Sequence, residues 1–85
     1  MEVTVYGPLR GATGEKTVTV DFDGGTVGEA LSALVDAYPR AERHLFENET
    51  LQSGVRVAVD GESVDADDDC PADASLSVHP AMRGG

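Results

Sequence analysis

The sequence has little cysteine, little lysine and no long apolar segment. Its 85 residues include one cysteine, Cys70, so no internal disulfide can form, and the chain is compatible with a reducing compartment. Cys70 lies in an acidic stretch beside Pro71, and we interpret it as an incidental thiol. The apolar stretches are only a few residues long, too short for a transmembrane helix or a secretory signal. We therefore expect a cytoplasmic protein.

Basic residues are scarce as well. Sixteen acidic residues face six lysines and arginines, and the formal net charge is -10. Such a surface repels phosphate groups, so we expect neither nucleic acid nor an anionic membrane as a partner, but proteins with basic docking faces. High acid content with a single lysine, Lys16, also resembles the proteins of extreme halophiles, whose carboxylate-rich surfaces stay soluble in concentrated salt.

The length allows one small domain with one core. Alternation of apolar and polar residues predicts five strands, over residues 2–6, 16–22, 55–59, 62–64 and 75–79. The first two are expected to form a hairpin across a glycine-bounded loop at 7–14, and the turn Asp60-Gly61 joins the third to the fourth. Residues 47–54 and 65–73 are predicted to be loops.

One main helix is predicted after the second strand. Thr26, followed three residues later by Glu29, forms a capping box, and Pro39 marks the end of the helix. The apolar residues between them recur at helical spacing, namely Val27, Ala30, Leu31, Leu34, Val35 and Tyr38. Residues 40–46 are predicted to add a short helical turn, with Ala41 and Leu45 on one face.

The order of these elements predicts an α+β fold of the β-grasp, ubiquitin-like type. A helix between two hairpins is satisfied by a mixed sheet of four to five strands that packs on the helix, with the last strand parallel to the first at the sheet centre. Pro80 cannot donate to a sheet ladder, so the chain should leave the sheet there. We expect a globular domain over residues 1–79 and a flexible tail over 80–85.

The tail ends in Gly84-Gly85. Glycine has no β-carbon, so an enzyme can hold this ending extended in a narrow channel and reach the α-carboxylate of Gly85, the candidate reactive group. Met82 and Arg83 are the candidate recognition residues, together with Gly84. Six residues at about 3.3 Å each would reach about 20 Å from Pro80. A frayed end and a linker remnant remain alternative explanations of the diglycine.

The sequence predicts no catalytic or metal site within the chain. The two histidines, His44 and His79, and the single cysteine lack zinc-ligand spacing, and the stretch 65–73 lacks the EF-hand pattern. One cysteine also excludes a plant-type iron-sulfur ferredoxin, which needs four cysteine ligands. No nucleophile elbow is present. We therefore expect a protein that is not itself an enzyme and binds no cofactor.

Three ordered landmarks resemble the MoaD/ThiS group of ubiquitin-like sulfur carriers. The segment Tyr6-Gly7-Pro8-Leu9-Arg10, with Gly14, is similar to the loop after the first strand in that group. Thr26-Val27-Gly28-Glu29-Ala30-Leu31 is similar to its helix-opening motif, and the terminal diglycine completes the pattern. With its acidic composition, the chain looks like the haloarchaeal small archaeal modifier proteins of this family.

The resemblance implies that an activating enzyme of the ubiquitin-activating type adenylates Gly85 with ATP. The adenylate can then be joined to lysines of target proteins by an isopeptide bond, or become a thiocarboxylate that carries sulfur. Molybdopterin-dedicated relatives often have two prolines and a small residue before the diglycine, whereas Arg83 here resembles the ubiquitin ending. We therefore favour protein modification by a monomer.

Two alternatives stay open: a MoaD-type small subunit that works with the large subunit of molybdopterin synthase, and a non-covalent acidic binding module. Lys16 is the candidate side-chain acceptor for self-conjugation, or else a simple exposed residue. A small apolar docking patch is expected near the tail, with Leu9, Phe46 and Met82 as candidates.

Overall fold

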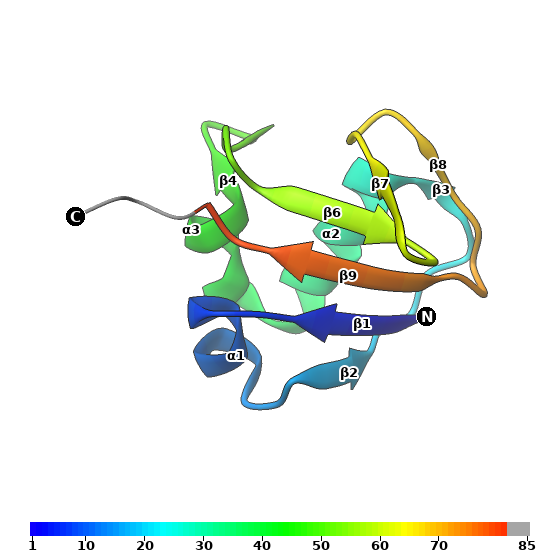
Figure 1. Cartoon of the computed structure of the whole chain (residues 1–85). Helices are drawn as coiled ribbons and strands as arrows, with labels where there is room; N and C mark the ends of the chain where they lie inside the picture. Colours follow the sequence, from blue (N-terminus) through cyan, green and yellow to red (C-terminus); the bar gives the residue numbers. More distant parts are fainter. Residues whose placement is uncertain (82–85) are drawn as a thin grey trace.

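A mixed five-stranded sheet in the order β2-β1-β9-β6-β7 forms one layer of the protein. The computed structural model describes residues 1–81. The central strand β9 runs parallel to β1 and antiparallel to β6 (Figure 1). This is the predicted β-grasp arrangement, and its strands are β1 (Glu2–Val5), β2 (Thr17–Thr19), β6 (Arg56–Val59), β7 (Glu62–Val64) and β9 (Ser75–His79).

Alternation along the strands places one set of side chains in the core. In the parallel pair, Val3 lies opposite Leu76 and Val5 opposite Val78, and all four are buried. The residues between them face the other side of the sheet, because successive side chains of a strand point to opposite faces. The central pair of strands is thereby fixed in register by apolar burial.

The main helix, α2 (Val27–Ala37), covers the apolar face of the sheet. The predicted capping box is present: the Glu29 amide donates to Thr26 Oγ1 at 3.1 Å, and the Thr26 amide donates to Glu29 Oε1 at 2.9 Å. Four residues of the predicted apolar stripe are fully buried, Val27, Ala30, Leu31 and Leu34. The predicted helical turn after Pro39 is also confirmed, as η1 (Pro39–Ala41) and α3 (Glu42–Leu45).

The loop predicted at residues 7–14 is wrong, because this segment forms the helix α1 (Pro8–Thr13). Pro8 lies in its first turn, where a missing N–H costs nothing, and Gly14 ends it at φ 82° with its amide bonded to the Arg10 carbonyl. Leu9 is fully buried and ties the helix to the core. β1 and β2 pair antiparallel as expected, but a helix connects them.

Two small ribbons also correct the predicted loops. β4 (Phe46–Glu47) pairs with β5 (Thr50–Leu51), and β3 (Gly25–Thr26) pairs with β8 (Asp69–Cys70). The second strand is shorter than predicted and stops at Thr19. Within residues 1–81, no helix combines the length and the apolarity that crossing a bilayer requires.

Candidate functional site

The tail is rooted at the centre of the sheet. β9 ends at His79 between β1 and β6, so the chain leaves the sheet from its central strand. The predicted reactive and recognition residues, Met82, Arg83, Gly84 and Gly85, lie outside the described residues. The structure therefore defines the root from which they extend, which is formed by residues 6–7, 54–56 and 79–81.

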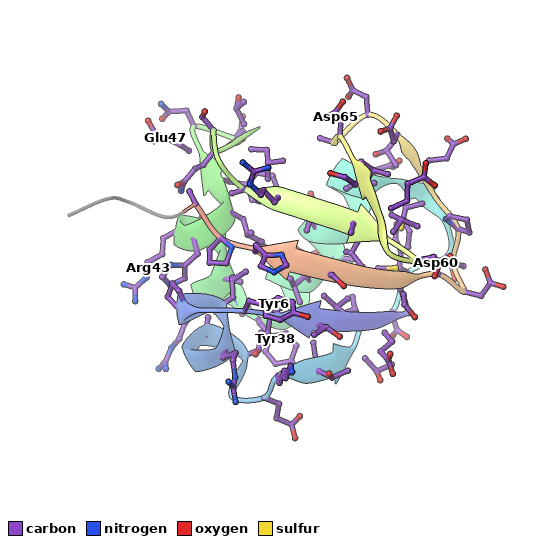
Figure 2. The ribbon with its side chains drawn as sticks, in the orientation of Figure 1. Tyr6, Tyr38, Arg43, Glu47, Asp60 and Asp65 are labelled. Atoms are coloured by element: carbon purple, nitrogen blue, oxygen red, sulfur yellow. The ribbon has the colours of Figure 1, made fainter. Side chains whose placement is uncertain are left out.

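An aromatic pair stands on the exposed face of this root. The Tyr6 ring and the His79 imidazole stack with centroids 4.1 Å apart and an interplanar angle of 4°. The Tyr6 amide donates to the Val78 carbonyl at 3.2 Å, which extends the parallel ladder by one bond. Figure 2 shows Tyr6 lying over the centre of the sheet. The last residue of β9 is thus held by the residue that follows β1.

Gly7 lies beside Pro80 at the tail root. Gly7 adopts φ 58° and ψ -139°, and a β-carbon built on it would lie 3.4 Å from Pro80 Cγ. That distance is an ordinary van der Waals contact, so it is the positive φ that favours glycine here. Pro80, beside it, is buried. The positive φ explains why a glycine follows Tyr6 at the end of β1.

Ala81 packs beside the loop that follows β5. A β-carbon on Gly54, which has φ 94°, would lie 3.5 Å from Ala81 Cβ, and Ala81 is half-buried. Pro80 and Ala81 thus pack against the domain. Four residues follow Ala81 in the sequence, and fully extended they can reach about 13 Å, which is shorter than the reach estimated from Pro80.

Basic side chains lie at this end of the molecule together with acidic ones of α3 and the β4–β5 hairpin. Arg56, exposed at the start of β6, lies opposite His79 in the ladder. Lys16, exposed just before β2, has its Nζ 5.7 Å from the Tyr6 ring centroid, a cation–π contact. Figure 2 shows Arg43 and the acidic Glu47 on the same side, whereas Asp60 and Asp65 lie at the opposite end. A partner that approaches the tail therefore avoids the most acidic loop.

The other candidate residues are distributed differently. Leu9 is buried, so its assignment to a docking patch is wrong, whereas Phe46 is half-buried and lines a groove. Cys70 is buried rather than part of a solvated loop, and its Sγ donates to Met1 Sδ at 3.6 Å. Burial, and secondarily the nearby Asp60 carboxylate, raise the pKa of this thiol above its ordinary value of 9.0. Among residues 1–81, no three His, Cys, Asp or Glu side chains are grouped to hold a metal ion.

A match to a known protein family identifies the kind of protein that carries this tail root. The model of the ThiS family matches residues 3–85. The chain belongs to the ThiS family. The members of this family are small carrier proteins and not enzymes. The segment around Tyr6 and Gly7, whose sequence resembles this family, forms part of the tail root.

Related proteins agree with this assignment. The ThiS-family chain is 36% identical to small archaeal modifier protein 1 of the halophilic archaeon Haloferax volcanii over 87 residues, which covers 100% of both chains. A crystal structure of that protein superposes with a TM-score of 0.88, at 33% identity over 96% of this chain and 97% of that one. A chain of the BexX/CysO complex of Amycolatopsis orientalis gives a TM-score of 0.80, at 26% identity over 99% and 98%.

Part of the site could not be found from single residues. The stacking of Tyr6 on His79 joins residues far apart in sequence, and only the parallel pairing of β1 with β9 brings them together. The predicted position of the last strand beside the first was the available signal. Nothing in the local sequence marked Gly54 as part of the site, because Ala81 comes close to it only once the sheet has formed.

Proposed function

We propose that this protein is a ubiquitin-like modifier whose Gly85 carboxylate is adenylated and then joined to lysine side chains of target proteins. The observation that carries the proposal is the full-length relationship to small archaeal modifier protein 1, combined with an Arg83-Gly84-Gly85 ending on a β-grasp domain. The fold supports it because the tail is rooted where β9 ends, and a partner can bind the domain while it holds the tail.

The chemistry requires activation by another protein. A carboxylate is a poor electrophile, so one of its oxygens attacks the α-phosphorus of ATP and pyrophosphate leaves. A lysine amine then attacks the acyl carbon of the adenylate, AMP leaves with the electron pair of the C–O bond, and the amine loses a proton. This chain supplies the substrate carboxylate, and the activating enzyme of the ubiquitin-activating type supplies the ATP site.

Sulfur transfer uses the same activated group. Hydrosulfide that attacks the adenylate instead of an amine releases AMP and leaves a thiocarboxylate on Gly85. Membership of the ThiS family favours this second fate. We propose sulfur transfer as an accompanying activity of the modifier. A role as the small subunit of molybdopterin synthase is the alternative that we favour less, because Arg83 stands directly before the diglycine.

Reconstitution followed by intact-mass spectrometry tests the proposal. The full chain is incubated with a purified activating enzyme, ATP, and either sulfide or a lysine-containing target protein. We expect a product heavier by the difference between sulfur and oxygen in the first case, and a covalent adduct that has lost one water in the second. A chain that lacks Gly84 and Gly85 is the control and should give neither.

Retention of full function by the truncated chain would instead show a non-covalent binding module. Absence of both masses with an enzyme that adenylates a known relative would overturn the proposal. These two results are distinguishable, since the first leaves partner binding intact and the second concerns the reaction alone.

A further inference from the structure

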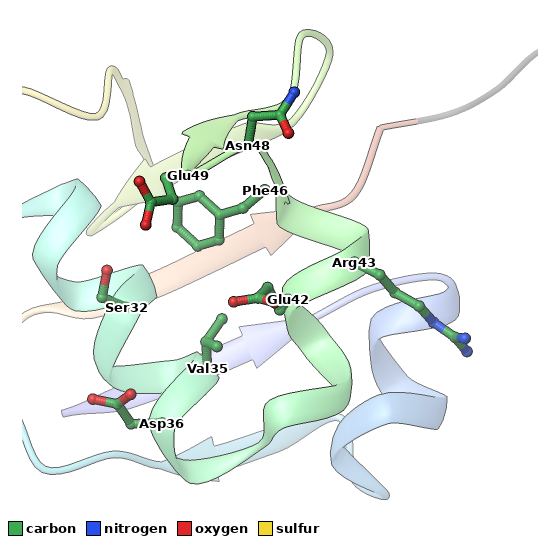
Figure 3. Close-up of a pocket in the computed structure, with 8 residues that line it drawn as sticks. All are labelled: Ser32, Val35, Asp36, Glu42, Arg43, Phe46, Asn48 and Glu49. Atoms are coloured by element: carbon green, nitrogen blue, oxygen red, sulfur yellow. The ribbon is translucent and has the colours of Figure 1, made fainter.

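A groove of about 750 Å³ lies between α2, α3 and the β4–β5 hairpin, on residues that the proposed chemistry does not use (Figure 3). Val35 and Phe46 are half-buried and form its apolar part. Figure 3 shows the Phe46 ring lying across the opening above Val35, with both side chains directed into the space between the helices. The groove thus offers an apolar surface that neighbouring side chains leave uncovered.

The rim of the groove is acidic. Asp36, Glu42 and Glu49 are exposed and line it from α2, α3 and the hairpin respectively. Figure 3 shows the Glu42 carboxylate directed into the groove, whereas the guanidinium of Arg43, the one basic residue in the lining, points away from it. Carboxylates on several sides of an apolar floor match an amphipathic cationic side chain, whose stem packs while its head is paired.

The wall of the groove is fixed by Gln52. Its side-chain Nε2 donates to the Arg43 carbonyl at 2.7 Å and to the Phe46 carbonyl at 3.1 Å. Its backbone amide donates to the Leu45 carbonyl at 2.7 Å. These bonds tie the β4–β5 hairpin to the end of α3. A wall that is ordered in advance lowers the entropic cost of binding a ligand.

We propose that this groove binds a short basic segment of a partner protein. An apolar side chain of the segment contacts Val35 and Phe46, and a neighbouring lysine or arginine reaches the carboxylates of Glu42 and Glu49. Charge complementarity selects this occupant, because a second copy of a chain with net charge -10 is repelled. The proposal goes beyond modification chemistry and does not depend on Gly85.

The groove also lies near the tail root. Gly54 follows Gln52 by two residues, and a β-carbon built on it would lie 3.5 Å from Ala81 Cβ, so the segment that fixes the groove wall continues to the tail root. A partner held in the groove therefore sits at the end of the molecule that carries the tail root. Binding here would raise the local concentration of that partner near the tail.

An NMR titration of the ¹⁵N-labelled full chain tests the groove. The probe is a short acetylated and amidated peptide of sequence Gly-Leu-Lys-Arg-Leu-Gly, and the matched neutral peptide carries glutamine at both basic positions. We expect saturable shift changes at the amides around Val35, Phe46 and Glu49 with the basic peptide. The acidic loop at residues 65–73 is an internal control, because it offers carboxylates and has no part in the groove lining.

Two double variants with the same change of charge separate the groove from general attraction. The groove variant is E42Q with E49Q, and the control is D67N with D73N in the acidic loop, all at exposed positions. We expect the groove variant to weaken peptide binding about fivefold in about 0.5 M salt, and the control less than about twofold. The dispersion of the amide spectrum verifies that both variants fold.

Several results would overturn the proposal. They are equal weakening by the two double variants, shift changes centred on residues 65–73, equal affinity for the neutral peptide, and absence of saturable binding. A chain without Gly84 and Gly85 should bind the basic peptide as the full chain does. Failure of the groove is therefore distinguishable from failure of the modification chemistry.

Discussion

The Tyr6 ring and the His79 imidazole lie parallel at a centroid separation of 4.1 Å, and they join the residue that follows β1 to the last residue of β9. Aromatic pairs contribute about 0.5–1.5 kcal/mol beyond the area they bury. We expect a double-mutant cycle with Tyr6→Ala and His79→Ala to give a coupling of about 0.5–1.5 kcal/mol in the free energy of unfolding. Denaturant unfolding measures it, and strictly additive effects would contradict the stacking.

Gly7→Ala tests the contact with Pro80. The variant places a β-carbon at φ 58° and 3.4 Å from Pro80 Cγ, so we expect a loss of about 1–2 kcal/mol of stability. Gly11→Ala is the matched control. Gly11 lies in α1, where a β-carbon would meet no atom within 4 Å apart from the helix's own backbone and its chain neighbours, and alanine is the better helix former by about 1 kcal/mol. Equal effects of the two substitutions on the unfolding midpoint would refute the account of the root.

Glu49→Gly tests the turn that carries the groove rim. Asn48 and Glu49 adopt φ 52° and 66°, a combination that favours asparagine followed by glycine in a two-residue hairpin. Replacing Glu49 by glycine removes the cost of a left-handed conformation, so we expect a gain of about 1 kcal/mol in the free energy of unfolding. Asp60→Gly should behave differently, because it also removes the bond from the Ser75 amide to Asp60 Oδ1. A destabilised Glu49→Gly variant would contradict the assigned turn.

Cys70 provides a prediction on pH. Because burial and the Asp60 carboxylate raise the pKa of its thiol in the folded state, the neutral thiol is favoured there, and the unfolded state ionises first. Its contribution to stability is complete below about pH 9, and it is lost as the pH rises through the raised value. We expect the unfolding free energy to fall more steeply above this pH in the natural chain than in Cys70→Ala, in paired denaturant titrations. Parallel curves would contradict it.

The sequence predicted those parts of the fold in which several signals coincide. Thr26 and Glu29 mark the start of α2 by paired hydrogen bonds that depend on local residues alone. Alternation of apolar and polar residues located the main strands, and the order of the elements then predicted the sheet. The helix α1 and the two-residue strands β3, β4, β5 and β8 were missed, since their local propensity is weak and tertiary contacts decide them. α1 contains Gly11, a weak helix former, and buries Leu9 and Thr13, while β8 buries Cys70 in the core.

The chemistry proposed for the candidate site comes from the sequence, whereas the geometry of the tail root comes from the structure. The ending Arg83-Gly84-Gly85 can be recognised from the sequence, because the proposed chemistry depends only on which residues end the chain and in what order. The root is not, since Gly54 and Ala81 meet only after β6 and β9 have paired. The groove beside α2 also requires the hairpin that local pattern did not reveal.

Lysine linkage gives the most direct test of the central claim, that Gly85 is joined to target proteins. Trypsin cleaves after Arg83, so a lysine modified by this chain keeps a Gly-Gly remnant that tandem mass spectrometry identifies. The natural host is compared with a strain that expresses the chain without Gly84 and Gly85. We predict remnants on lysines of several proteins in the first strain and none in the second. Their absence from both, with the protein and its activating enzyme detected, would contradict the account.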